Sequence, residues 1–284
     1  MEEFRIQTQS GGLAIAVLLL LISALVVGDE AIGEPSSIDI FLSGDHGRGV
    51  EALRPAAIAG DATAQFYLGL AYAKGWGVIQ DAAKAAGWYQ RSAAQGYHKA
   101  QFNLALSYLK GRGVDVDVER ARELLMNASR AADGFAEHQL GLLSYRGIGV
   151  ERNLEQARNW WLKAADHGHA DAAFNLGTMY RQGIGVTRDL QAALKWWQTA
   201  AARGSAEGQN ALGMAFMRGE AVQVDLLAAW AWFRIAAENG LQVAQINADG
   251  LMTDFDQAAA DAALERYEKV RLDMPTKNDQ QTNN

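Results

Sequence analysis

Residues 145–153 read YRGIGVERN, and residues 180–189 read YRQGIGVTRD. The shared Gly-Ile-Gly-Val begins at Gly147 in the first stretch and at Gly183, 36 residues later, in the second. A Gly-x-Gly turn before a helix is a pattern that can bind phosphate, so the pair raises the question of a duplicated nucleotide site. The rest of the chain favours a different interpretation.

The Gly-x-Gly-Val turn recurs at a constant spacing of 36 residues. It begins at Gly75 (GWGV), Gly111 (GRGV), Gly147 and Gly183 (GIGV) and, in degenerate form, Gly219 (GEAV). Three more sets of equivalent residues, which we call columns, also recur every 36 residues. They are Asp81, Asp117, Asn153, Asp189 and Asp225; Gly60, Gly96, Ala132, Gly168, Gly204 and Gly240; and Trp88, Leu124, Trp160, Trp196 and Trp232. Such regularity indicates a repeat architecture, with units at 61–96, 97–132, 133–168, 169–204 and 205–240.

Each unit is predicted to form two helices joined by the glycine turn. In the first unit, Leu68 and Tyr72 lie on one face of a helix over 62–74, and Gly75 ends it in the left-handed conformation of a C-terminal cap. Asp81 is placed to accept hydrogen bonds from the first free amides of the second helix. Because no Lys-Ser/Thr pair follows the turn and no strand precedes it, the pattern does not favour a phosphate-binding loop.

Small residues inside the first helix and large ones inside the second predict how the helices pack. Glycine recurs within the first helix at 69, 141, 177 and 213, with Ala105 in the second unit. Glycine costs about 1 kcal/mol relative to alanine there, so its repeated use predicts that another helix backbone passes close by. The second helix carries the spacing of a buried stripe, at Ala85, Trp88, Tyr89, Ser92 and Ala93.

Residues 62–93, ATAQFYLGLAYAKGWGVIQDAAKAAGWYQRSA, resemble the Sel1-like repeat family, a group related to tetratricopeptide repeats. Residues 169–204 match the pattern almost as well, whereas the second unit has Leu124 and Leu125 for the aromatics and the fifth has Ala221 for the second glycine. The resemblance covers about 44–271. It implies a right-handed α-solenoid that serves as a scaffold for protein–protein contacts, often in bacterial envelopes.

We therefore expect an all-α, right-handed α-solenoid of about five 36-residue helix-turn-helix repeats with capping helices at both ends, preceded by an N-terminal hydrophobic helix. The N-terminal capping helix is assigned to 44–60 and the C-terminal capping helices to 241–272, where the register is lost. Residues 34–43 are assigned to a linker, and 273–284 to a disordered tail.

The N-terminus predicts export. Residues 11–28, GGLAIAVLLLLISALVVG, form an uncharged run whose length lies between a signal-peptide core and a membrane span. Residues 1–33 are therefore a signal peptide, cleaved after Gly33, or a retained membrane anchor, and both alternatives stay open. We expect an inner-membrane-anchored protein with its repeats outside the cytoplasm, or a soluble periplasmic or secreted protein after cleavage.

Composition argues against several classes of function. The net charge of −7 argues against nucleic acid, which needs a basic face. The absence of cysteine excludes disulfides, thiolate metal sites and thiol nucleophiles. DHGHAD at 166–171 clusters ligand-type residues, but two histidines in one turn without a third fixed ligand do not predict a metal site. No catalytic motif such as HExxH or GxSxG is present, so we expect no enzyme, cofactor or metal.

The exposed face of the first helices predicts where a partner binds. One column reads Tyr67, Asn103, Gln139, Asn175 and Ala211, and another reads Lys74, Lys110, Arg146, Gln182 and Arg218. In related helical repeats the first helices line the inner surface, where amides can bind an extended backbone and cations its carboxylates. We predict that Asn103, Gln139, Asn175, Lys74, Lys110, Arg146 and Arg218 bind an acidic or C-terminal peptide segment. An ordinary solvated helix face is the alternative.

The predicted function is thus a non-enzymatic scaffold or adaptor of the cell envelope that binds a partner protein or peptide on the inner face of the repeats. The alternative is a carbohydrate- or peptidoglycan-associated cell-wall protein that stacks sugars on exposed aromatics. Trp76, in a turn, is the tryptophan expected to be exposed, whereas the second-helix tryptophans Trp88, Trp160, Trp196, Trp197 and Trp232 are expected to pack in the core.

Overall fold

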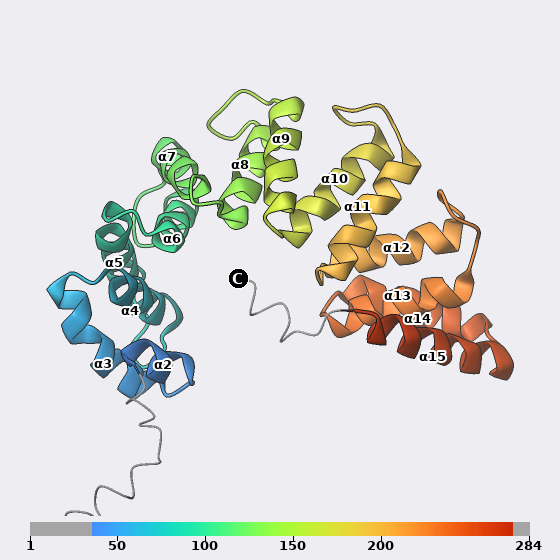
Figure 1. Cartoon of the computed structure of the whole chain (residues 1–284), viewed down its shortest axis with the longest axis horizontal. Coiled ribbons are helices and arrows are strands. Elements are labelled where there is room, and N and C mark those ends of the chain that lie inside the picture. Colours follow the sequence, from blue (N-terminus) through green and yellow to red (C-terminus); the bar gives the residue numbers. More distant parts are fainter. Residues whose placement is uncertain (1–35, 275–284) are drawn as a thin grey trace, which may run out of the picture.

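The structure is a computed structural model that describes residues 36–274, and within them every regular element is an α-helix. The helices are α2 (Ser37–Leu42), α3 (His46–Ala59), α4 (Ala62–Lys74), α5 (Ala82–Ala94), α6 (His98–Lys110), α7 (Val118–Ser129), α8 (Gly134–Arg146), α9 (Leu154–Asp166), α10 (Ala170–Gln182), α11 (Leu190–Ala202), α12 (Ala206–Arg218), α13 (Leu226–Glu238), α14 (Gln242–Asp254) and α15 (Gln257–Leu272). Figure 1 shows them following one another along an arc, with α6 and α8 on its inner side relative to α7 and α9.

The ten helices from α4 to α13 form the five predicted helix-turn-helix pairs, and each first helix packs on its own second helix and on the second helix of the preceding pair. The predicted caps of the second helices are confirmed. The side chains of Asp81, Asp117, Asn153, Asp189 and Asp225 each accept a hydrogen bond of 2.8–3.0 Å from the backbone N–H three residues ahead. Satisfying these free amides makes each second helix begin at the same point of its repeat.

The glycine inside each first helix accommodates an aromatic ring of its partner helix. A Cβ at Gly69 would lie 2.7 Å from the ring of Tyr89, and one at Gly213 would lie 2.6 Å from the ring of Phe233. The rings of Trp161 and Trp197 contact Gly141 and Gly177 in the same way. The predicted close helix backbone is confirmed at Gly69, Gly177 and Gly213, where a Cβ would lie 3.1–3.3 Å from a backbone carbonyl oxygen of the partner helix, although the ring atoms are nearer still.

Of the two adjacent aromatic columns that were predicted to pack in the core, the second is the deeply buried one. Tyr89, Leu125, Trp161, Trp197 and Phe233 are at most 4% exposed. Of the predicted core tryptophans, Trp197 is buried, whereas Trp88, Trp160, Trp196 and Trp232 are half-buried. Cations cover two of these outer rings: the Arg91 guanidinium lies 4.5 Å from the Trp88 ring and Lys163 Nζ lies 4.7 Å from the Trp160 ring.

The second glycine of each turn lets the turn pack against the preceding repeat. Gly113 has a φ of +75°, and a Cβ there would collide with the carbonyl group of Ala82 at the start of α5. Ala221 occupies this position in the last repeat with a φ of +63°, a conformation that disfavours side chains. The carbonyl oxygen of Ala221 accepts a 3.0 Å hydrogen bond from Gln191 Nε2, which ties this turn to α11.

Both ends of the array carry extra helices. At the N-terminal end, α2 lies inside the segment 34–43 that was assigned to a linker, which corrects that assignment. A capping box between Ser36 and Asp39 starts α2, and Phe41 anchors it, 1% exposed, against α3 and α4. At the C-terminal end, α14 packs against α13, and α15 also packs against α13.

No helix within residues 36–274 has the length and apolar character needed to cross a bilayer. The predicted hydrophobic helix and the alternatives for residues 1–33 lie outside the described residues, as does most of the predicted tail, 275–284. The structure therefore leaves these predictions as they were.

The glycine–aromatic contact predicts that Gly141→Ala destabilises the protein when residue 161 is tryptophan but not when it is leucine. Gly141→Ala is expected to reduce the free energy of unfolding by about 1–3 kcal/mol, because the methyl group overlaps the Trp161 ring. In a Trp161→Leu background, which resembles the natural Ala105–Leu125 pair of the second repeat, the same change should be neutral or stabilising.

Urea unfolding of the four proteins measures this cycle. Gly87→Ala, at a helix position where a Cβ meets nothing within 4 Å, is the matched control and should stabilise by about 0.5–1 kcal/mol. Equal costs of Gly141→Ala in both backgrounds would contradict the contact.

Candidate functional site

The amides of the predicted column, Asn103, Gln139 and Asn175, are half-buried on α6, α8 and α10. Asn103 Nδ2 donates to the Lys99 carbonyl oxygen at 2.8 Å within its own helix, and Asn175 Nδ2 lies 3.0 Å from His138 Nε2 of the preceding first helix. Gln139 is half-buried between them in the column. Two of the three predicted amides are thus partly engaged within the protein.

The amide column extends beyond the five repeats onto α14. Asn247, 36 residues beyond Ala211, lies on α14 and donates from Nδ2 to Asn210 Oδ1 at 3.1 Å. This contact is equivalent to that of Asn175 with His138. Extending the 36-residue register past residue 240 would have revealed it.

The predicted cation row is exposed at the C-terminal ends of the first helices. Lys74, Lys110 and Arg146 form no ion pair with any described residue. Arg218 differs, since its Nη1 lies 3.7 Å from Glu220, a carboxylate that Arg181 already binds in a bidentate manner at 2.8 and 3.0 Å. The hydrogen bonds from Arg181 hold the pKa of Glu220 below its usual range.

A cleft of about 550 Å³ lies at the N-terminal ends of α6, α8 and α10. Its apolar wall is a chain of rings in which Phe102 lies 5.9 Å from Phe135, and Phe135 lies 4.8 Å from His169, edge to face. Phe135 is 55% exposed, and the exposed Lys99 and the half-buried Asn103 line the same cleft. Of the seven predicted partner-binding residues, the cleft therefore contains Asn103, while Arg146 and Asn175 line a separate pocket of about 150 Å³ between α8 and α10.

Two stacked imidazoles lie beneath the cleft. The rings of His138 and His169 are 4.3 Å apart and tilted by 20°. Burial, reinforced by the neighbouring His169, lowers the pKa of His138 to about 4, against an upward effect of Asp171. Burial also lowers the pKa of His169, while Asp171 and Asp133 act to raise it. Both rings are therefore neutral at pH 7, and His138 Nε2 can accept from Asn175.

Two further histidines join elements around the cleft. His98 Nδ1 lies 2.8 Å from Asp133, the residue that caps α8, and His167 Nδ1 lies 2.6 Å from Glu137. Glu137 is 2% exposed and takes the place of the buried glutamines Gln65, Gln101 and Gln209 of other repeats. Because a buried carboxylate needs a partner, His167 compensates for a change that would otherwise leave a charge unpaired.

The histidines of the DHGHAD turn point into different contacts: His167 binds Glu137, whereas His169 stacks on His138. Within residues 36–274, no three His, Cys, Asp or Glu side chains are grouped so that they could hold a metal ion.

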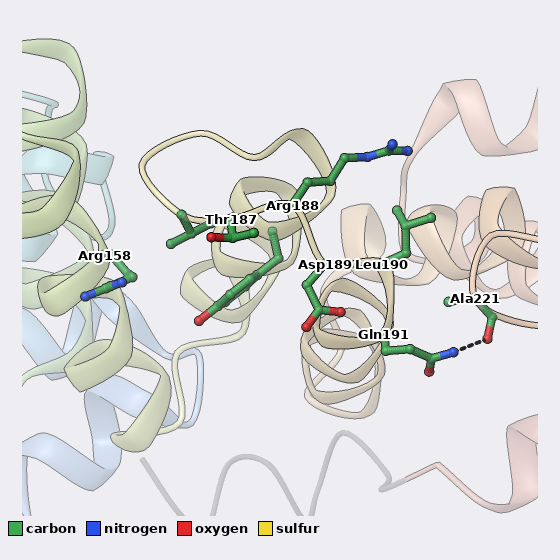
Figure 2. Close-up of a pocket in the computed structure, with 9 residues that line it drawn as sticks. Arg158, Thr187, Arg188, Asp189, Leu190, Gln191 and Ala221 are labelled. Atoms are coloured by element: carbon green, nitrogen blue, oxygen red, sulfur yellow. Dashed lines mark hydrogen bonds between the residues drawn. The ribbon is translucent and has the colours of Figure 1, made fainter.

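A second depression, of about 570 Å³, lies between α9, α11 and the turn after α10. In Figure 2 its polar side chains diverge: Arg188 and Gln191 extend away from Arg158, and Gln191 is engaged with Ala221. Since the groups do not converge on one point, this depression is a weaker candidate than the cleft.

A family model described as "Sel1 repeat" matches five consecutive segments, at 62–97, 98–133, 134–169, 170–205 and 206–241. The chain belongs to the Sel1 repeat family. The matched units begin one residue after the repeats assigned from the sequence. No match was found among curated proteins.

Solved structures of Sel1 repeat proteins are similar over most of this chain. A Sel1 repeat protein from Oxalobacter formigenes is 29% identical with a TM-score of 0.70, covering 81% of this chain and 94% of its own. The Escherichia coli protein c5321, a protective antigen of uropathogenic strains with an SLR fold, is 27% identical with a TM-score of 0.67. That match covers 90% of this chain, which spans 56% of the antigen.

More distant similarity, to an immunity protein from Pseudomonas aeruginosa at 19% identity and a TM-score of 0.52, shows the shared fold alone. It covers 72% of this chain and 83% of that protein. Sel1 repeat proteins are generally scaffolds for protein interactions, and the family is typically non-enzymatic.

The neutral, buried state of His138 predicts acid sensitivity. Above pH 6.5 the ring is neutral in both the folded and unfolded chains; below it the unfolded chain takes up the proton and the folded chain does not until about pH 4. Lowering the pH from 7 to 5 should therefore cost about 2 kcal/mol of stability through this residue.

His138→Asn is the matched variant, because Asn210 occupies the same column and accepts from Asn247. Its free energy of unfolding, measured in urea at pH 7 and pH 5, should fall less than that of the wild type. Parallel declines would show that His138 titrates normally in the folded protein.

Proposed function

We propose that this Sel1 repeat protein is a non-enzymatic scaffold of the cell envelope that binds a segment of a partner protein along the inner face of the array. The observation that supports this most directly is the cation row. Lys74, Lys110 and Arg146 recur every 36 residues, are exposed and have no ion-pair partner among the described residues, although the chain as a whole has a net charge of −7. Cations left unpaired in an acidic protein favour an anionic partner.

The cleft adds an apolar subsite to this surface. Phe135 and its neighbouring rings form a wall that side chains of a bound segment can contact, and Lys99 lies beside it. An acidic or C-terminal peptide segment would place carboxylates on the cation row and an apolar side chain in the cleft. This arrangement resembles peptide recognition more than small-molecule chemistry, because the groups are spread along several repeats.

Glycan binding is the alternative function. Trp76 is 37% exposed, as expected for a sugar-stacking residue, but one face of its ring stacks on His46 at 4.7 Å and 5°. Because His46 covers one face of the Trp76 ring and the buried Phe41 ring also lies 6.1 Å from it, the scaffold function is better supported than sugar stacking.

Charge reversal of the cation row tests the inner face. In a crosslinking pull-down from cells, Lys74→Glu, Lys110→Glu and Arg146→Glu together should abolish capture of a partner that the wild type captures, and the capture should weaken with added salt. The control reverses three exposed cations outside the first helices, Arg112, Arg130 and Lys195.

Unchanged helicity and melting temperature are required of both triple variants. A partner captured equally by all three proteins would refute the inner-face site. Loss with Trp76→Ala but not with the inner-face variant, together with binding to isolated peptidoglycan, would support the glycan alternative.

The envelope location is supported by the uncharged run at 11–28. Alkaline phosphatase, which is active only outside the cytoplasm, fused after Asn284 is expected to be active, because the run directs translocation of the residues C-terminal to it. Deleting residues 11–28 should abolish that activity. An inactive, cytoplasmic fusion of the full chain would contradict the proposed location, and the mass of the mature protein would distinguish an anchor from a cleaved signal.

A further inference from the structure

The first helix after the five repeats, α14, sits in the position of a sixth first helix. It packs against α13 as α12 packs against α11. Asn247 continues the amide column and bonds to Asn210 on α12. The opposite side of α14 is therefore the side that would face a further repeat.

That side of α14 is uncovered. Ile246 is 67% exposed, whereas Phe66 and His138, which occupy the same column, are 6% and 9% exposed. In the earlier repeats the next junction covers this position: the Tyr97 ring lies 5.2 Å from Phe66 and the His169 ring lies 4.3 Å from His138. At the end of the array α15 turns back onto α13, so nothing among residues 36–274 covers Ile246.

The uncovered side has a coherent apolar stripe. Val243, 49% exposed, precedes Ile246 by three residues, and Gly250 follows it by four, so all three lie on one face of α14. A Cβ at Gly250 would meet nothing within 4 Å, unlike one at Gly213, which meets the Phe233 ring. A helix glycine without a neighbour of its own costs about 1 kcal/mol, and it leaves room for the close approach of another helix.

The charged residues of α14 on this side are all negative. Asp254 continues the stripe four residues after Gly250, and Asp249 borders it. Both aspartates are exposed and neither forms an ion pair with a described residue. The sequence of α14, QVAQINADGLMTD, contains no lysine or arginine.

We propose that this surface, the α14 face formed by Val243, Ile246 and Gly250 with Asp249 and Asp254 at its border, docks an amphipathic helix of a partner protein whose apolar stripe is flanked by lysine or arginine. The docked helix extends the array by one more helix. It places apolar side chains on Ile246 and cations on the two aspartates. This site is separate from the inner face and has the opposite charge.

Charge and composition argue against the other occupants. A second copy of α14 would bring two pairs of aspartates together without a cation. Residues 275–284, PTKNDQQTNN, offer no apolar stripe, and the run at 11–28 carries no cation. A basic amphipathic helix would supply apolar side chains to the stripe and cations to the aspartates at its border.

The test uses three synthetic helical peptides of about 20 residues, long enough for an isolated helix to form. The first has a leucine stripe flanked by lysine, the second has the same stripe flanked by glutamate, and the third has the lysine composition with the stripe scrambled. In fluorescence anisotropy with the full-length chain, the first should bind at least about tenfold more tightly than the others.

Variants of the chain locate the binding. Ile246→Lys should weaken the first peptide roughly ten- to hundredfold, since it removes the buried contact and adds a like charge. Ile58→Lys, at a residue 69% exposed on α3, is the matched control and should change nothing. The pair Asp249→Lys and Asp254→Lys should transfer preference to the glutamate-flanked peptide. Equal binding of all peptides, or no effect of Ile246→Lys in a folded variant, would overturn the proposal.

Because the chain has no cysteine, a single Ile246→Cys variant reports whether the face is open. Its thiol should react with a maleimide as fast as that of Ile58→Cys at every protein concentration. Slower reaction that is independent of concentration would show a segment of the same chain on α14, and slower reaction only at high concentration would show a second copy. Either result would overturn the proposal.

Discussion

The contact between a helix glycine and an aromatic ring sets the spacing of four of the five helix pairs in this protein. The ring of Tyr89, Trp161, Trp197 or Phe233 lies on the bare backbone at Gly69, Gly141, Gly177 or Gly213. In the second repeat, where the large residue is Leu125, the helix has Ala105 instead. Ring size and backbone spacing therefore change together. In a solenoid each unit contacts only its neighbours, so one packing solution used four times, with an alanine–leucine variant in the second repeat, defines the whole arc.

Features that depend on local backbone chemistry could be predicted from the sequence. The turn glycines and the caps of the second helices follow from which residues accept a left-handed φ or a free amide, and these requirements act within a few residues. The choice between the adjacent aromatics Trp88 and Tyr89 could not be made in this way, because both fit the helical period. Tyr89 is buried because Gly69 lies opposite it, which is a contact between two helices.

In the candidate site, too, features set by local sequence could be predicted and features set by contacts between helices could not. The exposed cations Lys74, Lys110 and Arg146 follow from periodicity alone, since a column at the helix end is solvated in every repeat. The cleft does not, because it depends on which residues replace the usual members of a column. His138 replaces phenylalanine and Glu137 replaces glutamine in the third repeat. Their partners Asn175 and His167 lie 37 and 30 residues away, so no local pattern links them.

A repeat protein must keep its stacking columns, and this restricts where it can acquire a specific surface. Two places remain: positions of the first helices that do not stack, and the end of the array, where no further repeat follows. Here the first carries cations and the second aspartates that form no ion pair with any residue of 36–274. Surfaces of opposite sign at different places on one rigid array would attract different partners and repel each other's ligands. Such a protein would hold two partners at a separation set by the number of repeats between them, which gives the length of the array itself a function.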